Sequence, residues 1–228
     1  MGFEEYQPGK HNEQPNEHRR LWEKSEANER EKKLEIQKSV VACAEYHKKL
    51  DGAGSYFNSK AANEAAKLLP VFNAIRKDKL PACLRNVLAH RIAYLELITG
   101  LGANKKLMAL IDKFQPTAFK AGLFAKDTRT IQASREYKEL DAHDFEQADK
   151  TVKSVFVRLK ALNTQKADWG KEAEQYLRAK GNKVQDPRVD DQSASLNLEK
   201  GLQIVMENFR NLQVFQRNQT VKNPRKST

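Results

Sequence analysis

Long apolar runs are missing from this chain of 228 residues. The longest ones, such as residues 40–44 and 155–157, fall far short of the about 18 residues that a membrane-spanning helix needs. Residues 1–10 carry three charges and no apolar segment, which argues against a secretory signal peptide. The sequence therefore predicts a cytoplasmic protein without a transmembrane segment, whose only membrane contact would be peripheral association with a membrane complex.

Cysteine and histidine, which supply most zinc ligands and many catalytic groups, are also scarce. Cys43 and His47 share one helix face at a spacing that suits zinc, but a tetrahedral site needs two more ligands. Cys83 and His90 cannot both supply them, because seven helical residues separate the two by about 10 Å. His143 lies in a short acidic turn that is typical of a helix N-cap. We expect reduced cysteines, no metal or cofactor, and no catalytic site.

Strand-like alternation of useful length is absent, whereas apolar residues recur every three or four positions in several segments. The strongest of these patterns predicts a central core helix that ends at Gly100 as its C-cap. A second stripe follows Asp144, the predicted N-cap of the next long helix. These patterns predict an all-α fold: an irregular multi-helix bundle with a long N-terminal helix and a C-terminal helix after a polar linker.

Composition divides the chain into six segments. Polar stretches with proline mark both a disordered lead-in and a linker, and two glycines stop the long N-terminal helix. The predicted segments are a disordered lead-in (1–15), a long, partly solvated helix and turn (16–56), a helical core (57–181), the linker (182–194), the C-terminal helix (195–216) and a basic disordered tail (217–228).

The long N-terminal helix begins at the predicted cap Asn16 and stays almost wholly polar as far as residue 33. Leu21 and Trp22 are the exception, and no other large apolar residue lies near them on this helix. They are expected either to dock on another subunit or to fold back onto the body. Apolar residues return in the second half, which is expected to dock on the body: Leu34, Val41 and Ala44, with Ile36 and Val40 beside them.

The C-terminal helix carries an apolar seam whose spacings alternate between four and three residues. This pattern is typical of a helix that packs along its length, either on the core of this chain or on a helix of another protein subunit. Together with Leu21 and Trp22, the seam forms the predicted partner-binding set. The seam residues are Leu198, Leu202, Val205, Phe209 and Leu212.

The net charge of +11 favours acidic partners such as nucleic acid, a membrane surface or an acidic protein face. Residues 95–111 resemble the helix-hairpin-helix motif of DNA-binding proteins, in which a Gly-apolar-Gly turn lets backbone amides approach a phosphate. The resemblance implies phosphate contacts at Gly100 and Gly102, with charge from Lys105 and Lys106. It departs from the motif at Lys106, where the family buries a small residue. The alternative is a glycine C-cap followed by a short loop.

The tail would add phosphate or lipid contacts through four basic residues, Arg217, Lys222, Arg225 and Lys226.

A non-enzymatic adaptor or scaffold subunit that works inside a larger protein assembly fits these features best. The overall layout is similar to that of small helical accessory subunits of bacterial type IV secretion coupling complexes of the Dot/Icm kind. That resemblance implies a cytoplasmic protein at an inner-membrane ATPase platform, where it helps recruit secreted substrates. The alternative is a DNA- or RNA-binding protein that uses the Gly100-Leu101-Gly102 turn and the basic tail.

Overall fold

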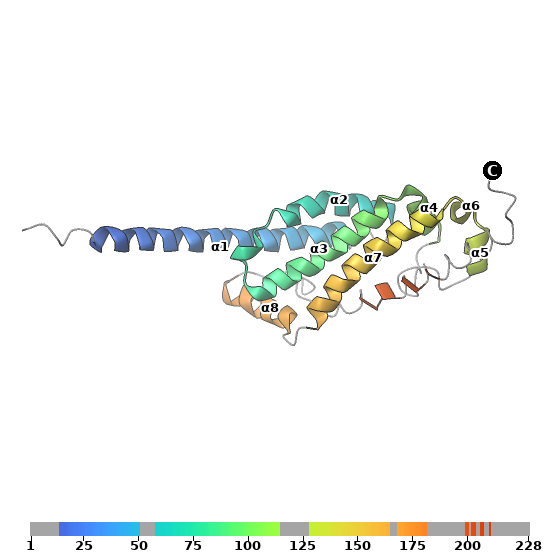
Figure 1. The fold of residues 1–228 in the computed structure, drawn as a ribbon. Helices are drawn as coiled ribbons and strands as arrows, with labels where there is room; N and C mark the ends of the chain where they lie inside the picture. Colours follow the sequence, from blue (N-terminus) through green and yellow to red (C-terminus); the bar gives the residue numbers. More distant parts are fainter. Residues whose placement is uncertain are drawn as a thin grey trace, which may run out of the picture.

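The structure is a computed structural model. It describes residues 14–50, 58–114, 128–164 and 168–181, together with residues 199, 200, 202, 203, 206, 207 and 210. All regular elements in these residues are helices, which confirms the all-α fold and the long N-terminal helix (Figure 1). In chain order they are α1 (Gln14–Leu50), α2 (Ser59–Asn73), the 3-10 turn η2 (Lys77–Lys79), α3 (Ala82–Gly102), α4 (Lys105–Lys113), α5 (Thr128–Ala133), α6 (Arg135–Lys138), α7 (Ala142–Asn163) and α8 (Trp169–Ala179).

We call the described helices that pack together around α3 the body. Helix α3 lies at its centre and contacts α1, α2, α4, α7 and α8. It corresponds to the predicted central helix, and its apolar residues are buried as that pattern implies. Helix α7 packs along it with a stripe that runs from Phe145 to Leu162. Helix α8 covers a third side of α3 and places Trp169, which is 1% exposed, in the core. The body therefore satisfies most of its own apolar surface.

The cap of α7 lies three residues before the predicted one. Asp141, not Asp144, is the N-cap, and its side chain accepts a hydrogen bond from the backbone N–H of Asp144 (2.9 Å). The Asp144 carboxylate returns the contact by accepting from the Asp141 N–H (3.0 Å). This reciprocal capping box satisfies two backbone donors that would otherwise lack partners at the helix start. Both aspartates and His143 are thus parts of a helix terminus.

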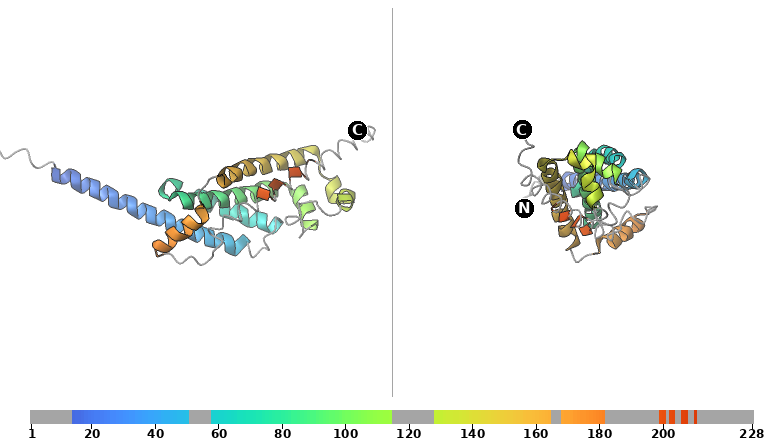
Figure 2. Two further views of the ribbon diagram at one scale, coloured as in Figure 1. Left: turned by 90° about the horizontal axis from the view of Figure 1, so that it is seen from below. Right: turned by 90° about the vertical axis from the view of Figure 1, so that its right-hand side faces the viewer.

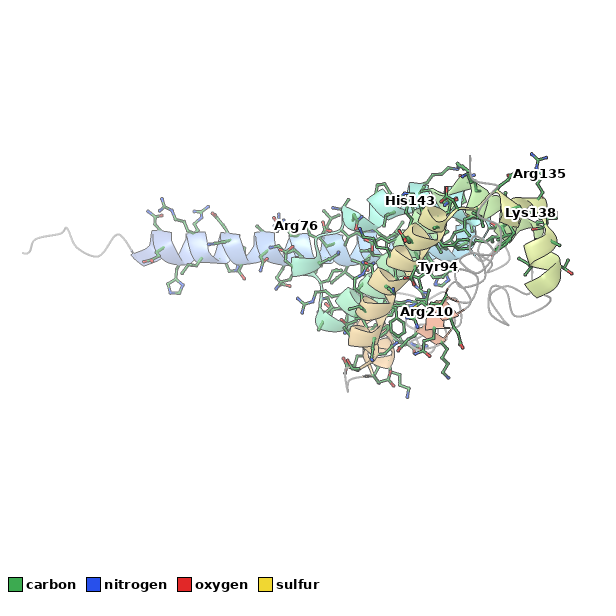
Figure 3. The ribbon with its side chains drawn as sticks, turned by 45° about the vertical axis from the view of Figure 1, so that its right-hand side comes forward. Arg76, Tyr94, Arg135, Lys138, His143 and Arg210 are labelled. Carbon is green, nitrogen blue, oxygen red and sulfur yellow. The ribbon has the colours of Figure 1, made fainter. Side chains whose placement is uncertain are left out.

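Helix α1 begins at Gln14, two residues before the predicted cap Asn16, and only its second half lies on the body. In Figures 1 and 2 the first half extends alone beyond all the other described helices. The body begins where Lys79 Nζ donates to Asn28 Oδ1 (2.7 Å) and pairs with Glu31 (2.9 Å). Arg76, labelled at this junction in Figure 3, also pairs with Glu31 (3.3 Å). We name residues 14–27 the arm.

The predicted C-terminal helix is described only in part, with helical backbone at residues between 199 and 210. Asn163, the last residue of α7, donates to Glu199 Oε2 (2.7 Å). Leu202 is 1% exposed and belongs to the main core, and Met206 packs against that core. This segment therefore packs on the body of its own chain.

Candidate functional site

Leu21 and Trp22, predicted to bind a partner, lie in the middle of the arm and are 59% and 61% exposed. The side chains of residues 16–25 are all exposed, and Figure 3 shows them spreading around the helix with no other described helix beside them. Local ion pairs, such as Arg19 with Glu23 (3.1 Å), support the helix itself. Leu21 and Trp22 therefore do not fold back onto the described body, which was the other expectation for them.

Trp22 continues the line of residues through which α1 packs on the body. Positions spaced alternately by four and three residues run along this face from 18 to 50. After the half-buried Lys32, the remaining positions of the line are all buried: Ile36, Ser39, Cys43, Tyr46 and Leu50. Nearer the N-terminus the same line passes through His18, Trp22, Ser25 and Glu29, which are exposed. The line comes near the end of α8 at Glu29, where a hydrogen bond from Lys32 and the charge of Lys180 lower the Glu29 pKa. Beyond it, from Ser25 to His18, the line continues past the described body and its side chains are exposed.

A second apolar surface lies on the other side of α1, where this helix meets α2. Leu34 (51% exposed) and Val41 (57%) face Val71 (51%) across an open groove of about 710 Å³. Its lining also includes Ala42, Leu68 and Ile75, which are buried, and Gln37 and Ala74, which are exposed. We call this the α1–α2 groove. The second half of α1 docks on the body as predicted, with Ile36 buried and Val40 packed against the core, but the prediction is wrong for Leu34, Val41 and Ala44, which are exposed.

The charged residues along the α1–α2 groove are paired with one another. Lys38 Nζ donates to Glu35 Oε1 (2.6 Å), and the Arg76 backbone N–H donates to Glu35 Oε2 (2.9 Å). These hydrogen bonds, of which the one from Lys38 has the larger effect, hold the pKa of the buried Glu35 below its ordinary value. Farther along, Lys49 lies 3.9 Å from Glu45. The groove is therefore apolar in its middle and close to neutral at its edge.

The helix-hairpin-helix interpretation is wrong, because no hairpin exists at Gly100 and Gly102. Both residues lie inside α3, which continues to Gly102, so the alternative of a C-cap at Gly100 is wrong too. A Cβ atom at Gly102 would lie 2.5 Å from Ala62 Cβ, and one at Gly100 would lie 2.8 Å from Thr151 Cγ2. The two glycines let α2 and α7 pack closely on α3. Because both lie within the helix, they do not form the turn that the motif uses to approach a phosphate.

The lysines after the glycines are not gathered into a phosphate site. Lys106 Nζ lies 3.7 Å from Asp141 and 3.6 Å from Asp144, so acidic groups already neutralise it. Lys105 is exposed in the first turn of α4, which Asn104 caps by accepting from the Leu107 N–H. The four basic tail residues lie outside the described residues: Arg217, Lys222, Arg225 and Lys226. The same holds for four residues of the C-terminal seam: Leu198, Val205, Phe209 and Leu212.

His47 and His90, together with Cys43 and Cys83, are buried packing residues. Burial raises the pKa of the Cys43 thiol to about 11, so it stays protonated at neutral pH. His47 Nε2 lies 3.3 Å from Arg91 Nη2, whose guanidinium stacks over the Tyr46 ring at 4.9 Å. Among the described residues no group of three metal-ligating side chains comes together. Cys43 and His47 lie on one helix face as expected, but no third metal-ligating side chain among the described residues joins them.

His90 is buried against Trp169, with 6.4 Å between the ring centroids. Burial, with a smaller contribution from the charge of Arg91, lowers its pKa to about 3. Its Nε2 atom and Trp169 Nε1 have no hydrogen-bond partner among the described residues. A histidine that stays neutral and has no carboxylate partner there lacks the geometry of a general base.

Comparisons with known proteins leave the α1 surfaces as the main lead to function. No known protein family, curated protein or solved structure matches this chain. None of the helices described is both long enough and apolar enough to cross a membrane.

The exposure of Leu21 and Trp22 on the arm could be predicted from the sequence, because the two stand alone among polar residues. The groove was missed, although Leu34 and Val41 are seven residues apart and so share one face.

Proposed function

We propose that this protein is a non-enzymatic helical adaptor, a scaffold subunit that binds other protein subunits of a larger assembly through helix α1. One observation carries the proposal. Of the six large apolar residues that are most exposed in the described chain, four lie on α1 and a fifth, Val71, faces α1 across the groove. Contiguous exposed apolar residues on a folded protein are typical of interaction sites.

The charge pattern of the α1–α2 groove favours a protein helix as its occupant over a phosphate backbone. Nucleic-acid sites depend on unpaired Lys and Arg side chains, whereas the groove lysines Lys38 and Lys49 already have carboxylate partners. An amphipathic helix would lay apolar side chains at spacings of three, four and seven residues between Leu34, Val41 and Val71. The wall from Leu34 to Lys49 rises about 22 Å, which accommodates about four helical turns.

We further propose that the assembly is a bacterial secretion coupling complex of the Dot/Icm kind, with the protein on its cytoplasmic side. The support for this finer proposal is the similarity of layout alone: a small, basic, helical chain with a long projecting helix. An accessory subunit of such a complex would contact other subunits rather than the lipid directly, so its association with the membrane would be peripheral.

Affinity purification of the native chain from its own cell, followed by mass spectrometry with and without nuclease, tests the adaptor role. We expect a set of proteins that survives nuclease treatment and loses members with Val41→Glu, because the groove would then have to bury an unpaired charge. Val157→Glu is the matched control, since Val157 is 65% exposed on α7, away from the groove. Recovery of the chain alone, or partners that disappear with nuclease, would contradict the proposal.

A further inference from the structure

We propose that the occupant of the α1–α2 groove is an amphipathic helix of another protein, with acidic residues at the end that lies over the C-terminus of α1 and the N-terminus of α2. This rests on the proposed function, since it names the partner of the same groove. The charged residues that line the groove are paired, but two lysines just outside its lining are not.

Helices α1 and α2 run in opposite directions along the groove, so each of its ends joins the end of one helix to the start of the other. At one end Arg76, which follows α2, donates its backbone N–H to Glu35 (2.9 Å) and pairs with Glu31 (3.3 Å). At the other end the charge of Lys49, in the last turn of α1, acts on Glu64 in α2.

Three lysines converge on one carboxylate at this second end. The hydrogen bond from Lys67 (2.7 Å) is the largest cause that lowers the pKa of Glu64, and the charges of Lys49 and Lys60 lower it further. Lys49 belongs to α1, whereas Lys60 and Lys67 belong to α2. Lysines therefore approach Glu64 from both walls of the groove.

Two lysines at this end have no carboxylate partner. Lys48 lies seven residues after Val41 on α1, and Lys60 lies seven residues before Lys67 on α2, so each continues a line that borders the groove. Both are exposed, and neither forms an ion pair with a described residue. We call the four lysines of this region the lysine end: Lys48, Lys49, Lys60 and Lys67.

The lysine end carries an excess of positive charge, because four lysines stand there against the two carboxylates of Glu45 and Glu64. Near Leu34, by contrast, three carboxylates are bonded to three cations. These are Glu35 with Lys38, Glu31 with Arg76 and Lys79, and Asp78 with Arg76. On the lines that border the groove, carboxylates of a partner would therefore be attracted most strongly to the lysine end.

An occupant that covers this groove has to be apolar in the middle and acidic at the lysine end. Apolar side chains are needed to bury Val41 and Val71. A neutral or basic surface over Lys48 and Lys60 would remove their hydration and supply no partner in return. An amphipathic helix with Asp or Glu beyond its apolar stripe meets both requirements, whereas a nucleic acid meets only the second.

Binding of two synthetic helical peptides to the purified full-length chain, measured by fluorescence anisotropy, tests this partner. Both peptides have about 16 residues and the same apolar stripe. One carries glutamates beside one end of the stripe, and the other carries lysines there. We expect the glutamate peptide to bind about tenfold more tightly, because it forms exposed ion pairs where the lysine peptide meets like charges. Added salt should reduce this difference.

The double variant Lys48→Glu with Lys60→Glu is expected to weaken binding of the glutamate peptide about tenfold and to strengthen binding of the lysine peptide. Both changes are at exposed residues, so the fold should be retained. Lys150→Glu with Lys160→Glu is the matched control, since it changes the net charge equally at exposed positions of α7. The control should leave the preference for the glutamate peptide unchanged.

Equal affinities for the two peptides, no binding of either, or equal effects of the two double variants would overturn the acidic partner. Duplex DNA that binds more tightly than the glutamate peptide, and is lost with Lys48→Glu and Lys60→Glu, would overturn it by assigning the lysine end to phosphate. Equal binding of both peptides that Val41→Glu abolishes would keep the groove as a protein site and overturn only its acidic partner. The adaptor proposal fails on a different result, the recovery of this chain alone from its own cell.

Discussion

Trp169→Ala is expected to lower the free energy of unfolding by about 3–5 kcal/mol, the range for removing a fully buried aromatic side chain. Trp169 is 1% exposed and joins the first turn of α8 to the central helix α3 through His90. Its loss would leave a cavity at this junction, because neither helix can move inward without disturbing the other contacts of α3. A loss of this size is a large fraction of the stability of a typical domain.

Trp22→Ala is the matched control, since the chain has two tryptophans and Trp22 is 61% exposed. We expect this change to alter the free energy of unfolding by less than about 0.5 kcal/mol. Urea denaturation followed by circular dichroism measures both variants. Similar losses in the two would mean that the arm packs on its own body, contrary to its unpartnered position.

Acidification from pH 7 to pH 5 is expected to cost about 2 kcal/mol of stability through His90 alone. Burial holds the pKa of His90 at about 3 in the folded chain, against an ordinary value of 6.5. Below pH 6.5 the unfolded chain therefore binds a proton that the folded chain does not, and stability falls as the pH falls. The effect continues until the pH approaches 3, where the folded chain also takes the proton.

The His90→Leu variant isolates this effect, because it removes the titrating group and also the unpartnered Nε2 atom. We expect the stability difference between the native chain and the variant to change by about 2 kcal/mol between pH 7 and pH 5. Denaturant titrations at each pH measure it, in a range above that in which most carboxylates titrate. An unchanged difference would show that His90 is solvated and free to act as an acid or base.

The helices of the body could be predicted from the sequence because each has one dominant apolar stripe. In α7 the buried positions run through Phe145, Val152 and Leu159, spaced by seven, with no competing stripe. Caps were less certain, because Asp141 and Asp144 both fit an N-cap and only the reciprocal hydrogen bonds identify the first. Periodicity predicts where a helix lies better than it predicts where the helix ends.

The orientation of α1 could not be predicted because it has apolar residues on two faces. Leu34 and Val41 form one line, and Ile36, Cys43 and Leu50 form the other. The buried line also contains Ser39, and Glu35 is buried beside it, so polarity along the sequence pointed to the wrong face. Likewise Gly100 and Gly102 look like a turn in sequence, and only the approach of Ala62 and Thr151 shows why small residues are needed there.

The two uncovered surfaces lie on different faces of one helix, which gives α1 a simple way to connect partners. The arm's line continues the face that packs on the body, whereas the α1–α2 groove lies on the other side. A single straight helix cannot turn both faces to the same neighbour. Two different partners can therefore be bound at the same time, one in the groove and one on the arm, which fits the proposed scaffold role.

Photocrosslinking from position 41 in the native cell tests the central claim most directly, namely that α1 is a protein-binding helix. A photoreactive amino acid replaces Val41 in one strain and Val157, as the matched exposed position on α7, in another. The account predicts a discrete, protease-sensitive adduct of higher mass from position 41 and none from position 157. Equal yields from both positions, or an adduct from position 41 that nuclease removes, would contradict it.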